Sequence, residues 1–162
     1  MPGTEEELST LQNLTPQALA AQLVPLPHRE YSISSIMEDG RLELLVRRME
    51  YPDGRPGLDS GWSTEHAELG AKIALRVRDN RSFHGPDDER PMILIGNGTG
   101  LAGLRAHLKE RVRRDYMRNW LLLGERSRDS DSLYANEISD WQKQGVLERT
   151  DLAFSRDQTP RI

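Results

Sequence analysis

PMILIGNGTGLAG, residues 91–103, is the stretch of this sequence that decides the fold. An apolar run of strand length, residues 92–95, enters a glycine-rich loop, and an amphipathic helix leaves it. In an α/β protein this order points backbone N–H groups and a helix N-terminus at one spot, which suits a phosphate or pyrophosphate. The alternative is that the glycines only permit a tight turn and close packing of the helix on the sheet.

Two further stretches, residues 120–123 and 151–154, are predicted to be short buried strands, and a helical stripe of apolar side chains precedes each. The first stripe holds Leu101, Leu104, Leu108 and Val112, and the second holds Tyr134, Ile138 and Trp141. Gly145 closes the second helix as its predicted C-terminal cap. The order strand–helix–strand–helix–strand predicts a parallel sheet with right-handed crossovers. Because such sheets bind ligands at the carboxyl ends of their strands, the three following loops are expected to share one edge.

The chain before residue 91 has a different pattern. Residues 1–28 form an acidic lead-in, in which Thr15 and Pro16 predict the start of a short helix. Apolar and polar side chains alternate between residues 30 and 78, most clearly at 42–46 and 73–77, as in half-buried β-strands. Residues 79–89 are polar and predict a connection between two parts of the chain.

Length and composition limit the classes of protein to consider. The 162 residues suit one domain of ordinary size or two small ones. The net charge of −4 gives no basic field, so no nucleic-acid partner is expected, and the absence of cysteine excludes thiol chemistry. The histidines lie far apart in the sequence, so no metal site is expected. No signal peptide or transmembrane segment is visible, which predicts a cytoplasmic location.

Two groups of residues extend the phosphate hypothesis. The second and third predicted strands end in Glu125-Arg126-Ser127-Arg128 and Ser155-Arg156. Arginines there favour a 2′-phosphate over a free 2′-hydroxyl, because guanidinium forks pair with phosphate oxygens; the alternative is a set of solvated surface charges. In Arg29-Glu30-Tyr31-Ser32, Arg29 and Tyr31 share one side of a strand. In one interpretation, the Tyr31 ring is a stacking surface and Arg29 binds a phosphate beside it. In the other, both are ordinary side chains of a strand.

Five motifs occur in an order that is similar to a known family. They are Arg29-x-Tyr31-Ser32, Gly61-Trp62-Ser63-Thr64, Gly98-Thr99-Gly100-Leu101-Ala102, Asn119-Trp120-Leu121 with Gly124-Glu125-Arg126, and Asp151-Leu152-Ala153-Phe154-Ser155-Arg156-Asp157-Gln158. Together they resemble the ferredoxin–NADP reductase superfamily, and within it the FAD/NADPH module of diflavin reductases of the sulfite reductase flavoprotein type. The resemblance covers residues 26–161 almost continuously.

This resemblance implies an α/β fold with a partial β-barrel. After the lead-in of residues 1–28, residues 29–88 would form an incomplete antiparallel FAD-binding barrel of the FR type. Residues 89–162 would form a partial, parallel, Rossmann-like NADP-binding sheet. The family's barrel begins upstream of the first motif, and its sheet continues beyond the last residue of this chain. The chain is therefore expected to be the central part of a reductase, cut at both ends.

The resemblance also implies cofactor-binding roles, first for FAD. Arg29 would pair with the FAD pyrophosphate, Tyr31 would stack on the isoalloxazine, and the Ser32 hydroxyl would act catalytically near flavin N5. The FAD diphosphate would be held by the backbone of Gly61, Trp62 and Ser63 and by the hydroxyl of Thr64. Trp62 departs from the family, which often has a small residue or cysteine at this position.

For NADPH, the implied residues follow the three strands. The pyrophosphate or nicotinamide side would meet Gly98, Thr99 and Gly100. The 2′-phosphate would be surrounded by Arg126, Ser155, Arg156 and Arg161. Gly103 departs from the family, which usually has proline there, so a looser turn is expected.

The implied function is hydride transfer from NADPH to FAD, with electrons passed to a flavodoxin-like FMN domain or another acceptor. The alternative is a truncated, catalytically inactive nucleotide-binding fragment of such a reductase, so the sequence leaves open whether the chain is an enzyme. Ser60-Gly61-Trp62 and Ile95-Gly96-Asn97 are also similar to bacterial reductases whose longer chains carry a membrane-embedded portion. The chain could then be the cytoplasmic part of a membrane-bound reductase.

Overall fold

The computed structural model describes residues 9, 12, 14–22 and 28–157. The chain divides into two units, Met1–Glu30 and Tyr31–Ile162. In the first unit, helix α2 spans Pro16–Gln22, and the Thr15 hydroxyl accepts a hydrogen bond from the backbone N–H of Ala18 at 3.3 Å. The predicted helix start at Thr15 and Pro16 is therefore confirmed.

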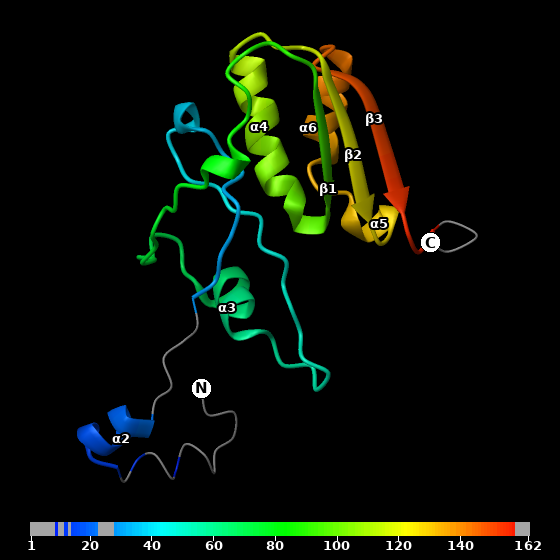
Figure 1. The fold of residues 1–162 in the computed structure, drawn as a ribbon. Coiled ribbons are helices and arrows are strands. Elements are labelled where there is room, and N and C mark those ends of the chain that lie inside the picture. The colour runs from blue at the N-terminus through cyan, green and yellow to red at the C-terminus, as the bar shows by residue number, and fades with distance from the viewer. Residues whose placement is uncertain (1–8, 10–11, 13, 23–27, 158–162) are drawn as a thin grey trace. The chain divides into compact units, whose positions relative to one another are not determined.

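Three parallel strands form the sheet of the second unit, in the order β1-β2-β3 (Figure 1). Strand β1 spans Met92–Asn97, β2 spans Asn119–Glu125 and β3 spans Leu147–Phe154. The predicted parallel sheet is confirmed, although β3 begins at Leu147, four residues before the predicted start. Residues 148–150 are polar and at least partly exposed, so this half of the strand shows no buried pattern in the sequence.

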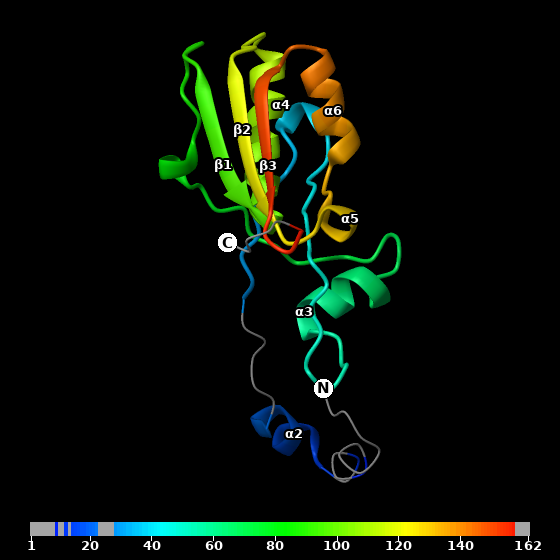
Figure 2. The same ribbon diagram turned by 90° about the vertical axis from the view of Figure 1, so that its right-hand side faces the viewer.

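Helices α4, Leu101–Arg113, and α6, Ala135–Lys143, connect these strands. Both crossovers run in the same direction across the sheet, and both helices therefore lie on the same face (Figures 1 and 2). The core between them and the sheet is centred on Leu108, Leu121 and Val146, which are fully buried. The short helix α5, Arg128–Asp131, lies in the loop between β2 and α6. No helix in the described ranges is long and apolar enough to cross a membrane.

The predicted cap at the end of α6, Gly145, determines the direction in which the chain enters β3. Gly145 has φ +77° and donates its N–H to the carbonyl of Gln142 at 3.1 Å. Val146 donates to the carbonyl of Trp141 at 2.9 Å, which completes a Schellman motif. This positive φ favours glycine at 145, and the reversal directs the fully buried Val146 into the core before β3 begins.

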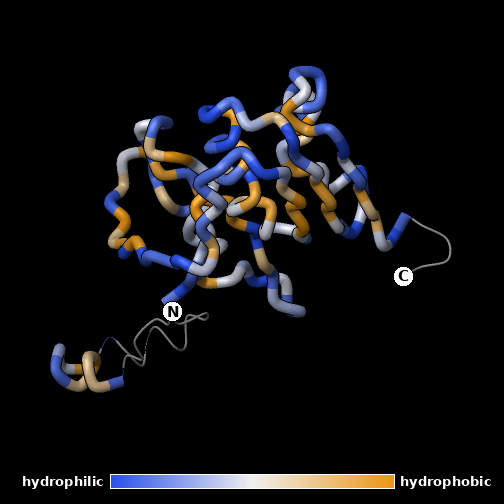
Figure 3. Tube along the Cα trace, turned by 45° about the horizontal axis from the view of Figure 1, so that its top comes forward, coloured by the Kyte–Doolittle hydropathy of each residue, from blue (hydrophilic) through white to orange (hydrophobic). Residues whose placement is uncertain are grey.

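Residues 31–91 contain little regular structure. Helix α3, Leu58–Gly61, continues into a π-helical turn, Trp62–His66, and two isolated bridges join Ile33 to Leu44 and Glu50 to Pro56. The strand expected near residues 73–77 has no ladder among the described residues, and its apolar side chains are more than half exposed. Hydropathy alternates along the chain in Figure 3, but alternation becomes a strand only where another strand pairs with it.

The last turn of α4 carries a carboxylate that makes stability depend on pH. Glu110 accepts hydrogen bonds from Arg113 at 2.6 Å and from Arg114 at 2.6 Å, and the Arg113 contact is the main cause that lowers the pKa of Glu110 to about 2. Because the folded-state pKa lies below the ordinary 4.5, this contact stabilises the fold at neutral pH, and its contribution is lost as the pH falls from about 4.5 to about 2.

Glu110→Gln is expected to flatten the loss of unfolding free energy between pH 5 and pH 2, measured by urea unfolding at each pH. Glu148→Gln is the matched control, because Glu148 is 58% exposed and only 3.5 Å from Arg118 in an open ion pair. An unchanged pH profile in Glu110→Gln would show that the contact with the two arginines does not stabilise the folded chain.

Candidate nucleotide-binding site

A cleft of about 520 Å³ opens at the carboxyl ends of the three strands. It is lined by Arg47, Asn97, Gly98, Thr99, Gly124, Glu125, Arg126, Ala153 and Ser155. Its walls therefore come from the loops after β1, β2 and β3, together with one residue from the preceding segment. The expectation that three loops meet at one edge of the sheet agrees with this geometry.

The glycines at the end of β1 and in the loop after it serve different purposes. Gly98 has φ +51°, and a Cβ on Gly96 would lie 2.8 Å from Leu104 Cδ1, so both are explained by the turn and by packing of α4 on β1. Gly100 has an ordinary helical φ of −59°, and no atom lies within 4 Å of the place where its Cβ would be. The fold does not require glycine at 100. Open space there, beside the N-terminus of α4, leaves room for an anion to approach the backbone.

The ends of β2 and β3 hold two arginines near one another. Ser155 donates its N–H to the carbonyl of Glu125 at 2.9 Å, and Arg156 donates to that of Arg126 at 2.8 Å, which extends the pairing beyond the strands. Both arginine side chains are exposed and make no hydrogen bond or ion pair within the described part of the chain. Arg161, predicted to join them, lies outside the described residues.

Arg128, the third arginine of this region, has a structural role. Its guanidinium lies 4.6 Å from the centre of the Phe154 ring, and its backbone N–H donates to Asp157 Oδ2 at 2.6 Å. The carboxylate of Asp157 therefore caps the start of α5. In the sequence, Arg126 and Arg128 belong to one motif. In the structure, the Arg126 side chain is exposed, whereas the Arg128 guanidinium packs on the Phe154 ring.

Ser32, from the motif expected to contact the flavin, lies near the start of helix α4. A Cβ on Gly103 would lie 3.6 Å from Ser32 Cβ and 2.7 Å from Phe83 Cε1, so Ser32 and the Phe83 ring both pack against the first turns of α4. The Phe83 ring fills the space beside Gly103, where the family usually has proline. The Tyr31 hydroxyl donates a hydrogen bond to Asp59 Oδ2. Arg29 belongs to the first unit, and its role stays a prediction.

Residues 61–64, expected to hold the FAD diphosphate, lie in and after α3. Gly61 is buried, and a Cβ there would lie 2.6 Å from Pro56 Cβ, so close packing alone accounts for this glycine. Ser63 Oγ donates to the carbonyl of Asp59 at 2.8 Å, and Thr64 Oγ1 donates to that of Ser60 at 2.7 Å. Both hydroxyls thus serve the preceding turn. The neighbouring Trp62 is 37% exposed, and a role in FAD binding for this segment stays a prediction.

Sequence reasoning missed an ion pair inside the cleft. Arg47 Nη2 lies 3.3 Å from Glu125 Oε2, although the two residues are 78 positions apart. The Glu125 side chain is only 3% exposed, and its Oε1 atom has no hydrogen-bond partner among the described residues. Glu125 also lines a smaller pocket of about 160 Å³ between α6 and the strands β2 and β3. No local signal in the sequence links Arg47 to this position.

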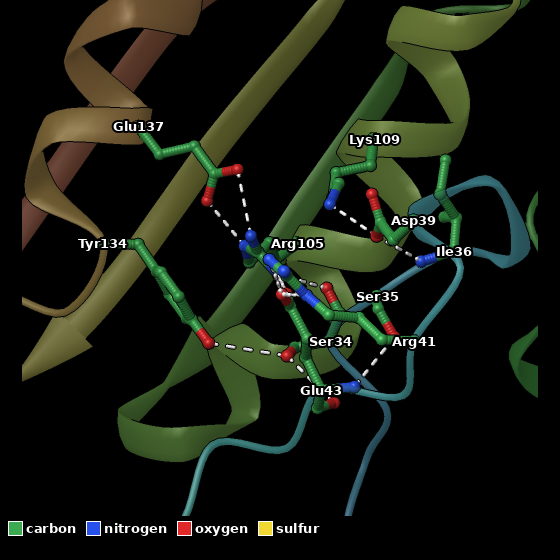
Figure 4. A network of polar contacts seen from close by, with 10 residues as sticks. All are labelled: Ser34, Ser35, Ile36, Asp39, Arg41, Glu43, Arg105, Lys109, Tyr134 and Glu137. Atoms are coloured by element: carbon green, nitrogen blue, oxygen red, sulfur yellow. Dashed lines mark hydrogen bonds and ion pairs between the residues drawn. The ribbon is translucent and has the colours of Figure 1, made fainter.

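A second cluster joins the segment after Ser32 to both helices (Figure 4). Arg105, on α4, donates to the carbonyl of Ser34 at 2.7 Å, to Glu43 Oε2 at 2.6 Å and to Glu137 Oε2 at 2.5 Å. Its guanidinium also lies 4.6 Å from the centre of the Tyr134 ring. The hydrogen bond from Arg105 is the main cause that lowers the pKa of Glu43. This cluster fixes residues 34–43 on α4 and thereby holds the Tyr31–Ser32 motif near the glycine-rich loop.

Comparisons with known proteins give two kinds of similarity. No family model matches the chain. The sulfite reductase [NADPH] flavoprotein alpha-component of Photobacterium profundum is 36% identical over an alignment 171 positions long, which covers 99% of this chain and 28% of that protein. The component of the same name from Vibrio cholerae is 38% identical over an alignment 164 positions long, which covers 97% of this chain and 26% of that protein. This chain therefore spans about a quarter of the length of these curated relatives.

A solved structure shares the fold. It is a mutant ferredoxin-NADP+ reductase from Plasmodium falciparum with 2′P-AMP, with a TM-score of 0.61 and 23% sequence identity. The match covers 78% of this chain and 53% of that chain. Together, the comparisons show that this chain shares the fold of a ferredoxin-NADP+ reductase and is similar in sequence to part of the sulfite reductase flavoprotein.

Proposed function

We propose that this chain is part of a reductase module that binds NADPH at the cleft, passes its hydride to FAD and sends the electrons to an acceptor. One observation carries the proposal: Gly98 and Thr99, in the glycine loop that precedes α4, line one cleft together with the ends of β2 and β3. That combination suits a dinucleotide with an additional phosphate. The names of the curated relatives, and the 2′P-AMP that accompanies the Plasmodium falciparum reductase in its solved structure, support it.

The groups that line the cleft, together with Arg156 next to the cleft-lining Ser155, have distinct tasks in this proposal. The backbone of Gly98–Gly100 and the first turn of α4 hold the pyrophosphate, with Gly100 leaving the space it needs. Arg126, Arg156 and the Ser155 hydroxyl contact the 2′-phosphate through charge-assisted hydrogen bonds. The bound NADPH supplies the hydride, and the protein fixes the nucleotide's position.

The proposed FAD site is the surface around Tyr31 and Ser32. Its support is the position of Ser32 against α4, the helix that follows the proposed pyrophosphate loop. In the proposed site, Tyr31 stacks on the isoalloxazine, Ser32 is the hydrogen-bonding group beside it, Arg29 pairs with the FAD pyrophosphate, and residues 61–64 hold the diphosphate. A flavodoxin-like or FMN-containing domain in the cytoplasm, or a membrane-attached portion of a longer chain, would accept the electrons.

A second candidate function is nucleotide binding without flavin turnover. The Thr64 hydroxyl, expected to hold the FAD diphosphate, donates to the carbonyl of Ser60 and is therefore engaged within the chain. The hydroxyls of Tyr31 and Ser63 also donate to protein acceptors. The proposed NADPH residues Arg126 and Arg156 have no such contacts in the described residues. This contrast favours the nucleotide cleft as the better-formed half of the site.

Calorimetry with NADP+ and NAD+, together with absorption spectra after incubation with FAD, separates the two candidates. The reductase proposal predicts both a bound-flavin spectrum and NADP+ binding at least about tenfold tighter than NAD+ binding, from contacts to the extra phosphate. Tight NADP+ binding by a colourless protein would support the second candidate. Equal and weak binding of both dinucleotides would contradict the assignment of the cleft.

A further inference from the structure

Asp59 connects the two segments that are expected to bind FAD. Its Oδ2 atom accepts a hydrogen bond from the hydroxyl of Tyr31, the residue expected to stack on the isoalloxazine. Its backbone carbonyl accepts hydrogen bonds from Ser63 Oγ at 2.8 Å and from the N–H of Trp62, both in the segment expected to hold the diphosphate. A flavin that stacks on Tyr31 and places its diphosphate on residues 61–64 would therefore pass beside the Asp59 carboxylate.

The donors of that segment are already used by the turn of α3. The Gly61 N–H donates to the carbonyl of Gly57 at 2.6 Å, and the Trp62 N–H donates to the carbonyl of Asp59. The Thr64 hydroxyl donates to a backbone carbonyl of the same turn at 2.7 Å. A diphosphate would have to compete with the turn for these donors. The segment therefore offers little to offset a negative charge that lies next to the diphosphate.

Asp59 supplies such a charge. Residues 58–66 contain two carboxylates, those of Asp59 and Glu65, and no lysine or arginine. Glu65 pairs with Arg48, whereas no lysine or arginine of the described residues pairs with Asp59. The hydrogen-bond partner of Asp59 is the neutral Tyr31 hydroxyl, which does not cancel the charge. Because like charges at close range repel, this carboxylate disfavours an anionic ligand at the neighbouring turn.

We infer that Asp59 determines which flavin this site accepts: its carboxylate opposes the diphosphate of FAD and favours a flavin that lacks one. This inference rests on the proposed flavin site around Tyr31 and Ser32. The hydrogen bond to Asp59 involves the hydroxyl of Tyr31 and not the face of its ring. Riboflavin, which has the isoalloxazine but no phosphate, avoids the repulsion and keeps the ring contact.

Asp59→Asn tests the inference, with Asp53→Asn as the matched control. Asparagine keeps the size of the side chain and an oxygen that can accept the Tyr31 hydrogen bond, but it removes the charge. FAD binding is expected to become at least about tenfold tighter, while riboflavin binding changes less than about threefold. Asp53 is 50% exposed and pairs with Arg55 at 2.8 Å, so its replacement should leave both affinities unchanged. Calorimetry on the full chain measures each, and the gain for FAD should shrink at about 1 M salt, where charges are screened.

Two further variants separate the charge of Asp59 from its hold on Tyr31. Tyr31→Phe removes the hydrogen bond but keeps an aromatic ring and the carboxylate, so it should not tighten FAD binding. Asp59→Glu keeps the charge and should not tighten it either. Circular dichroism and thermal melting of each variant confirm that it is folded. If Tyr31→Phe tightens FAD as much as Asp59→Asn does, or if Asp59→Asn tightens FAD and riboflavin equally, Asp59 acts by restraining the tyrosine and the inference is wrong.

The same titrations distinguish this inference from the proposed flavin function. If riboflavin binds and Asp59→Asn leaves FAD binding unaltered, the inference is rejected and the flavin site stands. FAD that binds the original protein more tightly than riboflavin does would also overturn the inference alone. If neither flavin binds the original protein or Asp59→Asn, the flavin site is rejected and the inference with it, whereas the assignment of the NADPH cleft is unaffected.

Discussion

Replacing Arg126 and Arg156 together with alanine is expected to weaken NADP+ binding by about 100-fold or more, while NAD+ binding changes less than about threefold. Charge-assisted hydrogen bonds to phosphate contribute about 1.5–3 kcal/mol each, and NAD+ lacks the phosphate that these arginines would contact. Both side chains are exposed and make no polar contact in the described residues, so their loss should leave the fold unchanged. Calorimetry with both dinucleotides at one salt concentration gives the ratio directly.

Arg128→Ala is the control for that double variant. Arg128 lies in the same loop as Arg126, but its guanidinium lies over the Phe154 ring at 4.6 Å. Its loss is expected to lower the melting temperature slightly and to leave the preference for NADP+ intact. Equal weakening of NADP+ and NAD+ in the double variant would show that the two arginines act as general cations and do not recognise the 2′-phosphate. An unchanged NADP+ affinity would place the 2′-phosphate elsewhere.

The parallel sheet could be predicted because its signals are local. The apolar run of β1, the glycine loop and the stripe of α4 each lie in one short stretch of sequence, and the alternation of strands and helices then predicts a parallel sheet with right-handed crossovers. Gly145 was predictable for the same reason, because a helix that ends in a reversal favours glycine just after its cap. The first half of β3 was missed because Glu148 and Arg149 are exposed, and only Leu147 marks the strand in the sequence.

Residues 31–91 were harder to predict because antiparallel pairing depends on distant partners. The alternation at 42–46 meets a partner only in the bridge of Leu44 with Ile33, and the alternation at 73–77 meets none among the described residues. A period of two shows that one face of a segment is apolar. It gives no information about the presence of a neighbouring strand.

The candidate site likewise contains one part that could be predicted from the sequence and one part that could not. Gly98, Arg126 and Ser155 could be placed together because each follows a parallel strand, and topology brings those ends to one edge. Arg47 and Glu125 are 78 positions apart, and Arg105 and Glu43 are 62 apart. Such pairs depend on how an irregular segment crosses the helices. No residue spacing or periodicity in the sequence encodes that path.

Arg105→Met is expected to lower the free energy of unfolding by about 2–3 kcal/mol. The methionine keeps most of the apolar stem, so the loss comes from the hydrogen bonds to Ser34, Glu43 and Glu137 (Figure 4). Removing one partner of a fully buried ion pair costs about 3–5 kcal/mol, because the remaining charge is left without compensation. The expected effect is smaller here because the side chains of Glu43 and Glu137 are 22% and 30% exposed and stay partly hydrated.

The place where stability is lost shows whether Arg105 holds residues 34–43 on α4 or stabilises the fold as a whole. Arg105 joins α4 to residues 34–43, so hydrogen exchange should rise first at the N–H of Ser34, bonded to the Glu43 carbonyl at 2.9 Å, and at the N–H of Glu43, bonded to Ser35 Oγ at 3.0 Å. Arg113→Met, on the same helix but 44% exposed, should cost less than about 1 kcal/mol and leave these amides protected. If Arg105→Met loses no more than about 0.5 kcal/mol, the range of neutral surface substitutions, the cluster does not hold the segment. If the cluster does hold the segment, the same variant loosens the Tyr31–Ser32 motif next to Ser34. Nucleotide affinity at the ends of β2 and β3 should then survive, while any flavin binding declines.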